Sequence, residues 1–291
     1  MEGSGADGGA VATVLVPAHD EAAVIGRCLR VLLEDVPPGR LKVLVVSNGS
    51  SDGTVAVARR AAAEFGHAVE ALELAQAGKI GALRAGLAAV DVWPVIVLDA
   101  DCELPAATAR ALADALATDV PTVASARLTV AAGASSALVR RFYRVWTSLP
   151  YVREGMVGSG VFALNEPGWR RLGDLPDVTN DDGWVRRSFA PHERVLVPEP
   201  FVAHAARTTR ALVSRRARIV NGNRELAVRL GAEDGPTNAG GLRGSVRSGQ
   251  VGLVDAAAFL LVTAASRCVA AVRRVRGDRR WGTDLTSRVA A

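Results

Sequence analysis

An apolar run that ends in two nearby carboxylates sets the strongest limit on how this chain folds. Residues 95–98 read Val-Ile-Val-Leu and are followed by Asp99, Ala100 and Asp101. A short β-branched run predicts a strand buried on both faces, and alternation along the strand points Asp99 and Asp101 the same way. Two converging carboxylates favour a divalent cation bound through oxygen. The alternative is a strand-end acid plus a cap for a helix starting near Pro105.

Predicted strands and helices alternate along the first 110 residues. Apolar runs predict strands at residues 11–16, 41–46 and 69–74, before the one at 95–98, and a helical pattern follows each of these three. This order predicts an α/β fold with a doubly wound, mostly parallel sheet and helices on both faces. Ligands of such sheets bind outside the carboxyl ends of the strands. Those ends carry Asp20 and Glu21, Ser47 and Asn48, and Asp99 and Asp101.

Composition fits one large core with an appendage. The chain has 291 residues, of which 49% are apolar, so it can bury an extensive core. Its three cysteines lack paired spacing, which argues against a zinc site or a disulfide framework and suits a reducing cytoplasm. Residues 1–10 are Gly-rich, carry no export signal and are expected to form a loose tail. We therefore expect a cytoplasmic protein.

Charge divides the chain into an acidic and a basic part. Residues 1–204 carry 19 Lys and Arg against 24 Asp and Glu, whereas residues 205–291 carry 16 against 6. A cationic segment can bind nucleotide phosphates, an anionic membrane or nucleic acid. Only two of the basic residues are lysines, so part of the arginine excess reflects the base composition of the genome. Aromatic residues do not alternate with the basic ones, as they do in proteins that bind single-stranded nucleic acid. Nucleic acid is therefore a disfavoured partner.

Four segments resemble, in order and spacing, the motifs of family 2 glycosyltransferases. They are residues 16–21 (Val-Pro-Ala-His-Asp-Glu), 46–54 (Val-Ser-Asn-Gly-Ser-Ser-Asp-Gly-Thr), 78–83 (Gly-Lys-Ile-Gly-Ala-Leu) and 99–101 (Asp-Ala-Asp). Each motif alone is weak, but the combination is specific. The resemblance implies a GT-A fold, a nucleoside-diphosphate sugar as donor, and Mn²⁺ or Mg²⁺ as cofactor.

The resemblance also assigns a donor site. Asp101 would bind the metal, with Asp99 on the ribose or metal side. The chain departs from the family at Ser47 and Asn48, where two aspartates are common. Asn48 can still read a base edge, but it cannot accept hydrogen bonds as a carboxylate does. The donor-binding residues implied are Pro17, Ala18, Glu21, Asn48, Lys79 and Asp99, of which Pro17, Ala18 and Glu21 would line the base and ribose pocket.

Two further segments resemble the acceptor half of the family. Residues 155–164 are Gly-punctuated and resemble the strand that lines the acceptor pocket, which implicates Gly158, Ser159 and Gly160. Asp181 and Asp182 precede a helical pattern and resemble the Glu-Asp motif. They could simply cap that helix. The resemblance makes Asp182 the general base and Asp181 its partner, and a shift of one residue would exchange the two.

Residues beyond 195 extend the predicted site. Residues 195–202 predict a strand, and His204 follows it. His204 is either structural or the residue that completes the metal coordination. As a metal ligand it would suit Mn²⁺ better than Mg²⁺. Arg215 and Arg218 match two positions of the Gln-x-x-Arg-Trp element of related synthases. Its Gln and Trp are missing, which disfavours a processive polymer synthase. The two arginines would bind the leaving diphosphate, or they form a solvated basic face.

The predicted domains are a donor half (11–110), an acceptor half (111–230) and a C-terminal extension (231–291). Residues 231–250 are Gly-rich and predict a linker, and residues 251–272 predict an apolar helix followed by arginines. Asp255 and a length below about 20 apolar residues argue against a membrane span. Three roles remain open for this helix. It could lie in the membrane interface and bring residues 251–280 to the inner face of a membrane, form a homodimer contact, or pack on the core.

These features together predict a metal-dependent glycosyltransferase. It would move one sugar from a nucleoside diphosphate to a hydroxyl or amine of a small or lipid-linked acceptor, with inversion. A sugar-phosphate nucleotidyltransferase of related fold is the main rival, but its phosphate loop should be Gly-rich and basic, whereas residues 17–21 are acidic. A phosphatase that uses Asp99 as nucleophile is a further alternative. Such enzymes usually carry the two-aspartate motif on the first strand, whereas Asp99 follows the fourth predicted strand. A non-catalytic nucleotide-binding or scaffold protein would not need both carboxylate pairs.

Overall fold

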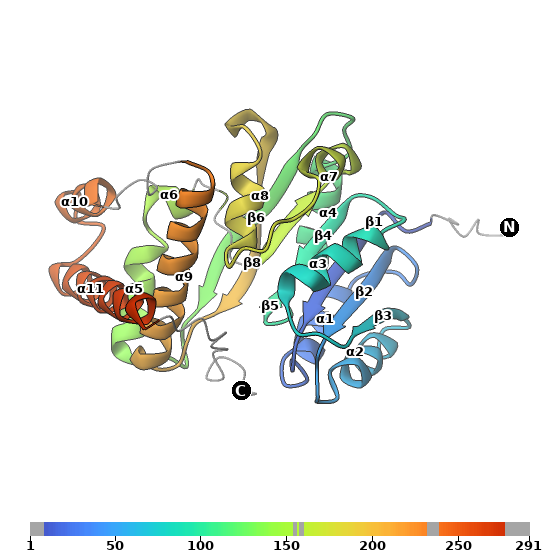
Figure 1. Ribbon diagram of the computed structural model, residues 1–291, viewed down its shortest axis with the longest axis horizontal. Helices are drawn as coiled ribbons and strands as arrows, with labels where there is room; N and C mark the ends of the chain where they lie inside the picture. Colours follow the sequence, from blue (N-terminus) through green and yellow to red (C-terminus); the bar gives the residue numbers. More distant parts are fainter. Residues whose placement is uncertain (1–8, 154–155, 157–159, 232–238, 277–291) are drawn as a thin grey trace, which may run out of the picture.

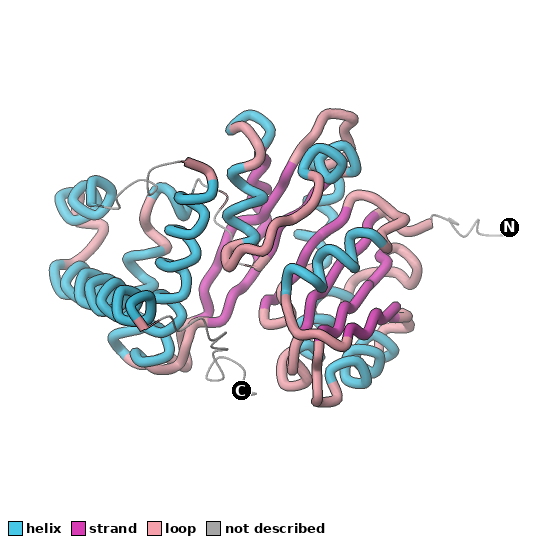
Figure 2. Tube along the Cα trace, in the orientation of Figure 1, coloured by secondary structure: helices cyan, strands magenta, loops and turns pink. Residues whose placement is uncertain are grey.

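One mixed sheet of eight strands organises the chain. The computed structural model describes residues 9–153, 156, 160–231 and 239–276. The strands lie in the order β3-β2-β1-β4-β7-β6-β8-β5. Figure 1 shows a group of helices at one end of the molecule, the first three strands of the sheet at the other end and the remaining strands between them, and Figure 2 shows the same path by element type.

The first half of the sheet is parallel, as the alternating pattern predicted. β1 pairs in parallel with β2 and with β4, and β2 pairs in parallel with β3. All four strands of this half therefore end at the same edge of the sheet. The elements are β1 (Ala12–Ala18), α1 (Ile25–Leu33), β2 (Leu41–Asn48), α2 (Thr54–Ala63), β3 (Val69–Leu74), α3 (Lys79–Ala88) and β4 (Val95–Leu98).

The second half of the sheet mixes directions. β7 runs antiparallel to both β4 and β6, β6 and β8 are parallel, and the two-residue strand β5 is antiparallel to β8. The pairing of β4 with β7 joins the two halves of the sheet. The elements are β5 (Cys102–Glu103), α4 (Ala106–Ala115), β6 (Val123–Ala131), β7 (Val161–Leu164), α7 (Glu166–Leu172), α8 (Asp181–Arg187), the 3₁₀ helix Pro191–Glu193 and β8 (Arg194–His204).

Helices cover both faces of the sheet, which confirms the predicted layering. One face packs against α1, α2 and α4 through residues such as Leu29, Ala58 and Leu112. The other face packs against α3 and α8 through residues such as Leu83 and Val185. The central strands are buried on both sides, which explains why their sequences are continuously apolar.

A third core lies among the helices at the end of the molecule. Phe142 of α5 stacks on Phe259 of α11, with ring centroids 5.1 Å apart. Asp255, near the start of α11, is bound by Arg141 at 2.7 Å and Arg144 at 2.8 Å, both from α5. The helices are α5 (Ala137–Trp146), α6 (Pro150–Arg153), α9 (Thr209–Arg229), α10 (Ala239–Arg247) and α11 (Leu253–Val275).

The C-terminal extension differs from its predicted form in two respects. The expected linker, 231–250, contains α10. The helix expected at 251–272 is α11, whose 23 residues are long and apolar enough to cross a membrane by length and composition only, so its length does not argue against a span. α11 shares a core with α5, which is the packing expected of one of the three roles left open for this helix.

Candidate active site

A largely buried lysine, whose side chain is 17% exposed, joins the two halves of the sheet at the carboxyl ends of the strands. Lys79 begins α3, and its Nζ lies 2.7 Å from Oδ1 of Asp99, which follows β4. The same Nζ lies 2.9 Å from Oδ2 of Asp181, the first residue of α8. Burial disfavours the ammonium, but Asp181, Asp99 and Asp182 outweigh burial and raise the pKa of Lys79 well above its usual value. Lys79 is therefore a charged cross-link.

Asp99 responds to the same charges in the opposite direction. Burial would raise the pKa of its carboxyl, but Lys79 outweighs burial, and Arg215 and Arg218 add to the effect. The pKa of Asp99 therefore falls below its usual value. The two arginines come from α9, so charges on that helix reach the strand end. Their role in binding a diphosphate stays a prediction.

Asp182 is the carboxylate best suited to accept a proton. Burial, together with the nearby charge of Asp181, raises the pKa of Asp182 to about 7 despite the opposing effect of Lys79. Its Oδ2 accepts a hydrogen bond of 3.1 Å from the backbone N–H of Gly160. Its Oδ1 is buried without a hydrogen-bond partner among the described residues. A carboxyl with a pKa near neutrality and an available oxygen has the properties of a general base.

Gly160 connects this carboxylate to the strand end. Its carbonyl accepts a hydrogen bond of 2.8 Å from the backbone N–H of Asp99. Its φ is +98°, and a Cβ there would lie 2.8 Å from Sγ of Cys102 and 2.9 Å from Oδ2 of Asp99. Only glycine satisfies both the conformation and the space. Gly160 was predicted to contact the acceptor, which stays a prediction. In the structure its backbone links Asp99 to Asp182.

Asp101 makes fewer side-chain contacts than Asp99 in the described structure. Its side chain is partly exposed, and its Oδ1 lies 3.9 Å from the thiol of Cys102. His204, the other predicted metal ligand, is held by Glu103, whose Oε1 lies 2.7 Å from Nε2 of the imidazole. The same Oε1 lies 2.8 Å from Nε of Arg27. Glu103 therefore fixes the position of the His204 ring.

The predicted metal ligands do not form a closed cage. Within residues 9–153, 156, 160–231 and 239–276, no three His, Cys, Asp or Glu side chains are arranged to hold a metal ion. Asp99 is paired with Lys79, and His204 is paired with Glu103. One available carboxylate would leave most of the coordination sphere of a divalent cation to substrate phosphates and water. The ligand set Asp99, Asp101 and His204 stays a prediction.

Asn48 is occupied in holding two loops together. Its Nδ2 donates a hydrogen bond of 2.8 Å to the carbonyl of Ala18, and its Oδ1 accepts one of 2.9 Å from the N–H of Gly78. Its own carbonyl contacts Nδ1 of His19 at 2.7 Å. The amide thus connects the end of β1 with the loop before Lys79. Whether Asn48 also reads a base edge stays a prediction.

The remaining predicted donor residues lie at the end of β1. Pro17 and Ala18 are buried, and Glu21 is buried with its backbone N–H donating to Oγ1 of Thr54 at 2.9 Å. These residues lie where a doubly wound sheet binds ligands. Two of the predicted acceptor residues, Gly158 and Ser159, lie outside the described residues.

Sequence reasoning missed the role of Glu103 and Arg27. The acidic residues at 99, 101 and 103 were visible in the sequence. Alternation along a strand does not give their directions, because β4 ends at Leu98 and the N–H of Cys102 donates to the carbonyl of Asp99 at 2.9 Å, which forms a turn. The signal for Arg27 was not available, because its contact with Glu103 depends on α1 packing beside β5.

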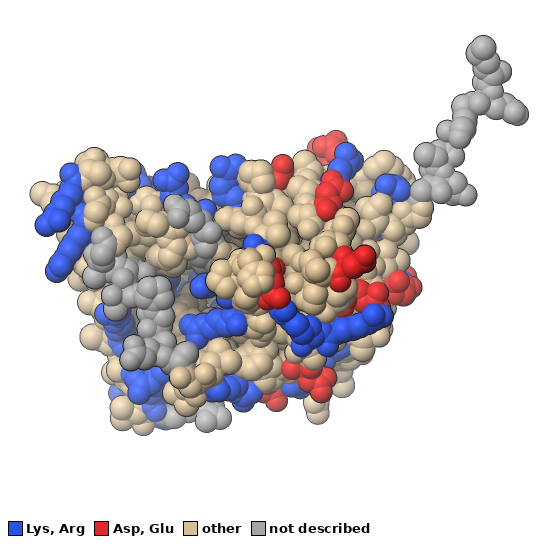
Figure 3. Space-filling view, turned by 90° about the horizontal axis from the view of Figure 1, so that it is seen from above, with Lys and Arg blue, Asp and Glu red and all other residues tan. Residues whose placement is uncertain are grey.

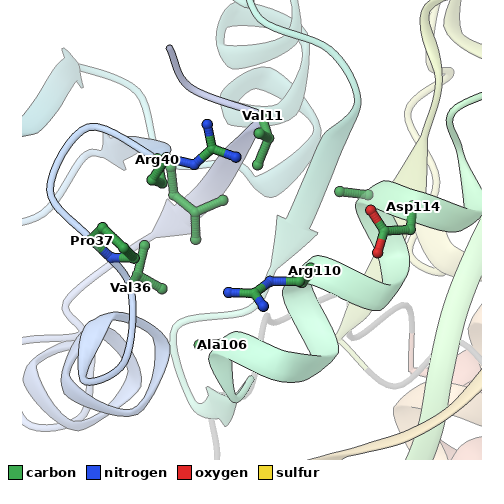
Figure 4. A pocket seen from close by; sticks show the side chains of 9 residues that line it. Val11, Val36, Pro37, Arg40, Ala106, Arg110 and Asp114 are labelled. Atoms are coloured by element: carbon green, nitrogen blue, oxygen red, sulfur yellow. The ribbon is translucent and has the colours of Figure 1, made fainter. Parts of the chain in front are cut away.

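A pocket lies at the opposite edge of the sheet from this site. It is formed where β1 and β2 begin and where α4 passes beneath them (Figure 4). The view shows Arg40 and Arg110 extending along its walls, with Asp114 at one side. Its lining residues are Val11, Val36, Pro37, Arg40, Leu41, Ala106, Arg110, Ala113 and Asp114. None of them belongs to the predicted site.

Solved structures share the fold. A mannosyltransferase from Pyrobaculum calidifontis, solved with GDP-Man and Mn²⁺, superimposes with a TM-score of 0.61 at 22% identity and covers 94% of this chain and 89% of that one. Glucosyl-3-phosphoglycerate synthase from Mycobacterium tuberculosis, in complex with phosphoglyceric acid, gives 0.52 at 19% identity and covers 77% and 81%. The chain therefore shares the GT-A fold of these structures, with acidic residues at its strand ends.

The sequence comparison gives the family. Residues 13–158 match the model of glycosyl transferase family 2, and the chain belongs to that family. A curated relative, glycosyltransferase AglE from Haloferax volcanii, is 33% identical over 91 residues. That match covers 31% of this chain and 30% of the relative, so it spans less than a third of either protein.

Proposed function

We propose that this enzyme transfers a single sugar from a nucleoside diphosphate to a hydroxyl or amine, with inversion and with a divalent cation. The observation that carries the proposal is the placement of Asp182. Its carboxylate is buried, has a pKa raised to about 7, and is linked through Gly160 to Asp99 at the end of β4. A base beside the donor end of the sheet is what an inverting transfer requires.

In the proposed reaction, proton transfer, bond formation and bond breakage occur in a single displacement at the anomeric carbon. Asp182 takes the proton of the acceptor hydroxyl or amine as that atom bonds to the anomeric carbon. The bond between the anomeric carbon and the diphosphate oxygen breaks on the opposite side, and the diphosphate leaves with the electron pair. Lys79 stays charged throughout and limits the repulsion between Asp99 and Asp181.

The donor diphosphate is assigned to the cationic side of the site. Arg215 and Arg218 lower the pKa of Asp99, so their charges act on the strand end where the phosphates would lie. Guanidinium groups bind phosphate oxygens in bidentate fashion. Nη1 of Arg215 also donates a hydrogen bond of 3.1 Å to the carbonyl of His204, which holds the guanidinium near the end of β8.

The chemistry of the residues fits a divalent cation. Asp101 offers a carboxylate that is not ion-paired in the described structure, and His204 offers the ring nitrogen that does not face Glu103. These two residues would hold the ion, with Asp99 beside them. The ion would supply positive charge that offsets the charge growing on the leaving diphosphate. Solved neighbours contain Mn²⁺ with GDP-Man and Mn²⁺ with UDP-glucose, which supports Mn²⁺ without excluding Mg²⁺.

We assign the acceptor to small or lipid-linked molecules in the cytoplasm or at the inner membrane face. A sugar-phosphate nucleotidyltransferase remains the main alternative, but the turn after β1 is acidic rather than basic. Its Asp20 accepts a hydrogen bond of 2.7 Å from the backbone N–H of Ser51, which ties this turn to the loop after β2.

Thermal-shift measurements with UDP and GDP, each with and without Mn²⁺, test the proposal. We expect one nucleotide to stabilise the protein in a Mn²⁺-dependent manner, and Asp101→Ala to abolish the Mn²⁺-dependent part. Asp114→Ala, in the pocket at the opposite edge, is the matched control and should behave as wild type. An unchanged Mn²⁺ effect in Asp101→Ala would refute the metal assignment. A protein that binds a nucleotide but neither releases nor transfers the sugar of the corresponding nucleotide sugar would favour a non-catalytic interpretation.

A further inference from the structure

Exposed apolar side chains concentrate on one helix. Of the ten large apolar residues that are exposed in the described part of the chain, six lie on α11. Isolated exposed apolar residues are normal, but a contiguous apolar surface indicates a binding surface. The six, with their exposed fractions, are Leu253 (77%), Val254 (64%), Leu260 (55%), Leu261 (61%), Val272 (48%) and Val275 (90%).

The opposite face of α11 is fixed to the protein. Phe259 and Val262 are almost completely buried in the helical core. Asp255 is held by Arg141 and Arg144 of α5. Crossing a bilayer would require this helix to leave its core and carry Asp255 into the hydrocarbon, which is costly. The helix is therefore built to lie along a surface rather than to span a membrane, although its length would allow a span.

Positive charge surrounds the apolar surface. Arg267 is exposed and lies seven residues after Leu260, which places both on one side of the helix. Arg276 is exposed at its end, and Arg243 and Arg247 are exposed on α10, which packs beside α11. In Figure 3 the charged side chains on the visible face of the helical end are basic, whereas the acidic ones lie over the other half, together with further basic ones. An apolar stripe with basic flanks matches an anionic lipid surface.

The same helix is linked to the proposed donor site. Arg273 of α11 donates a hydrogen bond of 2.7 Å to Oγ of Ser214, the residue before Arg215 on α9. Asn221 of α9 donates one of 3.3 Å to the carbonyl of Ala270. A surface that holds α11 therefore holds the helix that carries the arginines assigned to the diphosphate.

From these observations we propose that α11 docks the enzyme flat on an anionic lipid bilayer through the surface formed by Leu253, Val254, Leu260 and Leu261. The acceptor would then be a molecule presented at the lipid surface, and this second step rests on the proposed function. The docking itself requires no donor, no metal and no catalysis, so it can be tested independently.

Vesicle co-sedimentation of the full chain tests the docking. Vesicles of equimolar phosphatidylglycerol and phosphatidylcholine should bind the wild-type protein, and pure phosphatidylcholine vesicles should bind it much less. The double variant Leu260→Glu/Leu261→Glu should bind at least about tenfold more weakly, since two apolar contacts are lost and two negative charges are added. Both side chains are exposed, so folding should be unaffected. Val120→Glu, whose side chain is 63% exposed elsewhere, is the matched control and should bind as wild type.

Three outcomes would overturn the docking proposal. Wild-type protein that fails to sediment with the anionic vesicles would refute it, and so would equal binding by the double variant. A wild-type dimer in light scattering, converted to a monomer by the double variant and without vesicle binding, would mean that a second copy covers the surface. Mn²⁺-dependent nucleotide binding should be unchanged in the double variant, which separates a failure of docking from a failure of the proposed function.

Discussion

Nζ of Lys79 lies 2.9 Å from Oδ2 of Asp181, which ties the first turn of α3 to the first turn of α8. The two helices belong to different halves of the sheet, and Asp99 lies on the other side of the ammonium at 2.7 Å. The carboxylates of Asp99 and Asp181 would repel each other if the cation were removed. Lys79 thus allows a donor-side carboxylate and the neighbour of the proposed base to lie close together.

Replacement of Lys79 by methionine should destabilise the protein by about 3 kcal/mol, because it leaves buried carboxylates without a counter-charge. Chemical denaturation measures the loss. Lys79→Arg keeps the charge and should lose less. The double variant Lys79→Met/Asp181→Asn should recover part of the stability, and a double variant no more stable than Lys79→Met would contradict the proposed pairing.

Asp182→Asn should reduce the rate of transfer by about 10²–10⁴, while nucleotide binding is retained. The pKa of Asp182 is raised to about 7, and a base is active when deprotonated, so kcat/KM of the wild type should rise as the pH increases through about 7 and level off above it. This rise should be missing from the residual activity of the variant. Steady-state kinetics between pH 5.5 and 9 check both points, those limits lying roughly two units around the expected pKa.

Asp181→Asn provides the comparison for that prediction. If Asp181 only positions its neighbours, its replacement should cost less than Asp182→Asn. The reverse ranking would assign the base to Asp181. Full turnover in both variants, at saturating donor and acceptor, would remove the inverting mechanism.

Gly160→Ala should impair both stability and transfer, because φ is +98° and the added Cβ would lie 2.9 Å from Oδ2 of Asp99. Thermal unfolding and a transfer assay measure the two effects. Gly133→Ala is the matched control, since a Cβ there meets no atom within 4 Å and its φ is not positive. Normal transfer by Gly160→Ala would show that the link between Asp99 and Asp182 is dispensable.

The first half of the fold was predictable because its strands are buried on both faces and therefore continuously apolar. The sequence placed strands at 11–16 and 41–46, and β1 and β2 occupy Ala12–Ala18 and Leu41–Asn48. The two-residue strand β5 carries too little pattern to be found, and its existence depends on pairing with β8. The sequence also could not predict which apolar residues of α11 are buried and which are exposed, because packing against α5 and α9 decides this.

The site was predictable in its residue types more than in its contacts. Spacing along the chain marked Asp99, Lys79 and Asp181 as polar residues at element ends. It could not reveal that Lys79 bridges the other two, because that contact depends on how β4, α3 and α8 meet. The same limit applies to Asn48, whose amide is occupied by Ala18 and Gly78.

Glu103→Ala should weaken Mn²⁺-dependent nucleotide binding by about 10- to 100-fold if His204 is a metal ligand, because a carboxylate partner orients a ligating imidazole. Titration calorimetry with UDP or GDP, with and without Mn²⁺, measures the change without requiring turnover. The replacement also removes the partner of Arg27, so a general loss of stability is a competing cause. Glu103→Gln separates the two, since its side-chain oxygen can still accept from Nε2 of His204 and should preserve most of the Mn²⁺ effect. Equal Mn²⁺ dependence in wild type, Glu103→Ala and His204→Ala would instead make the pair a structural contact between β5 and β8.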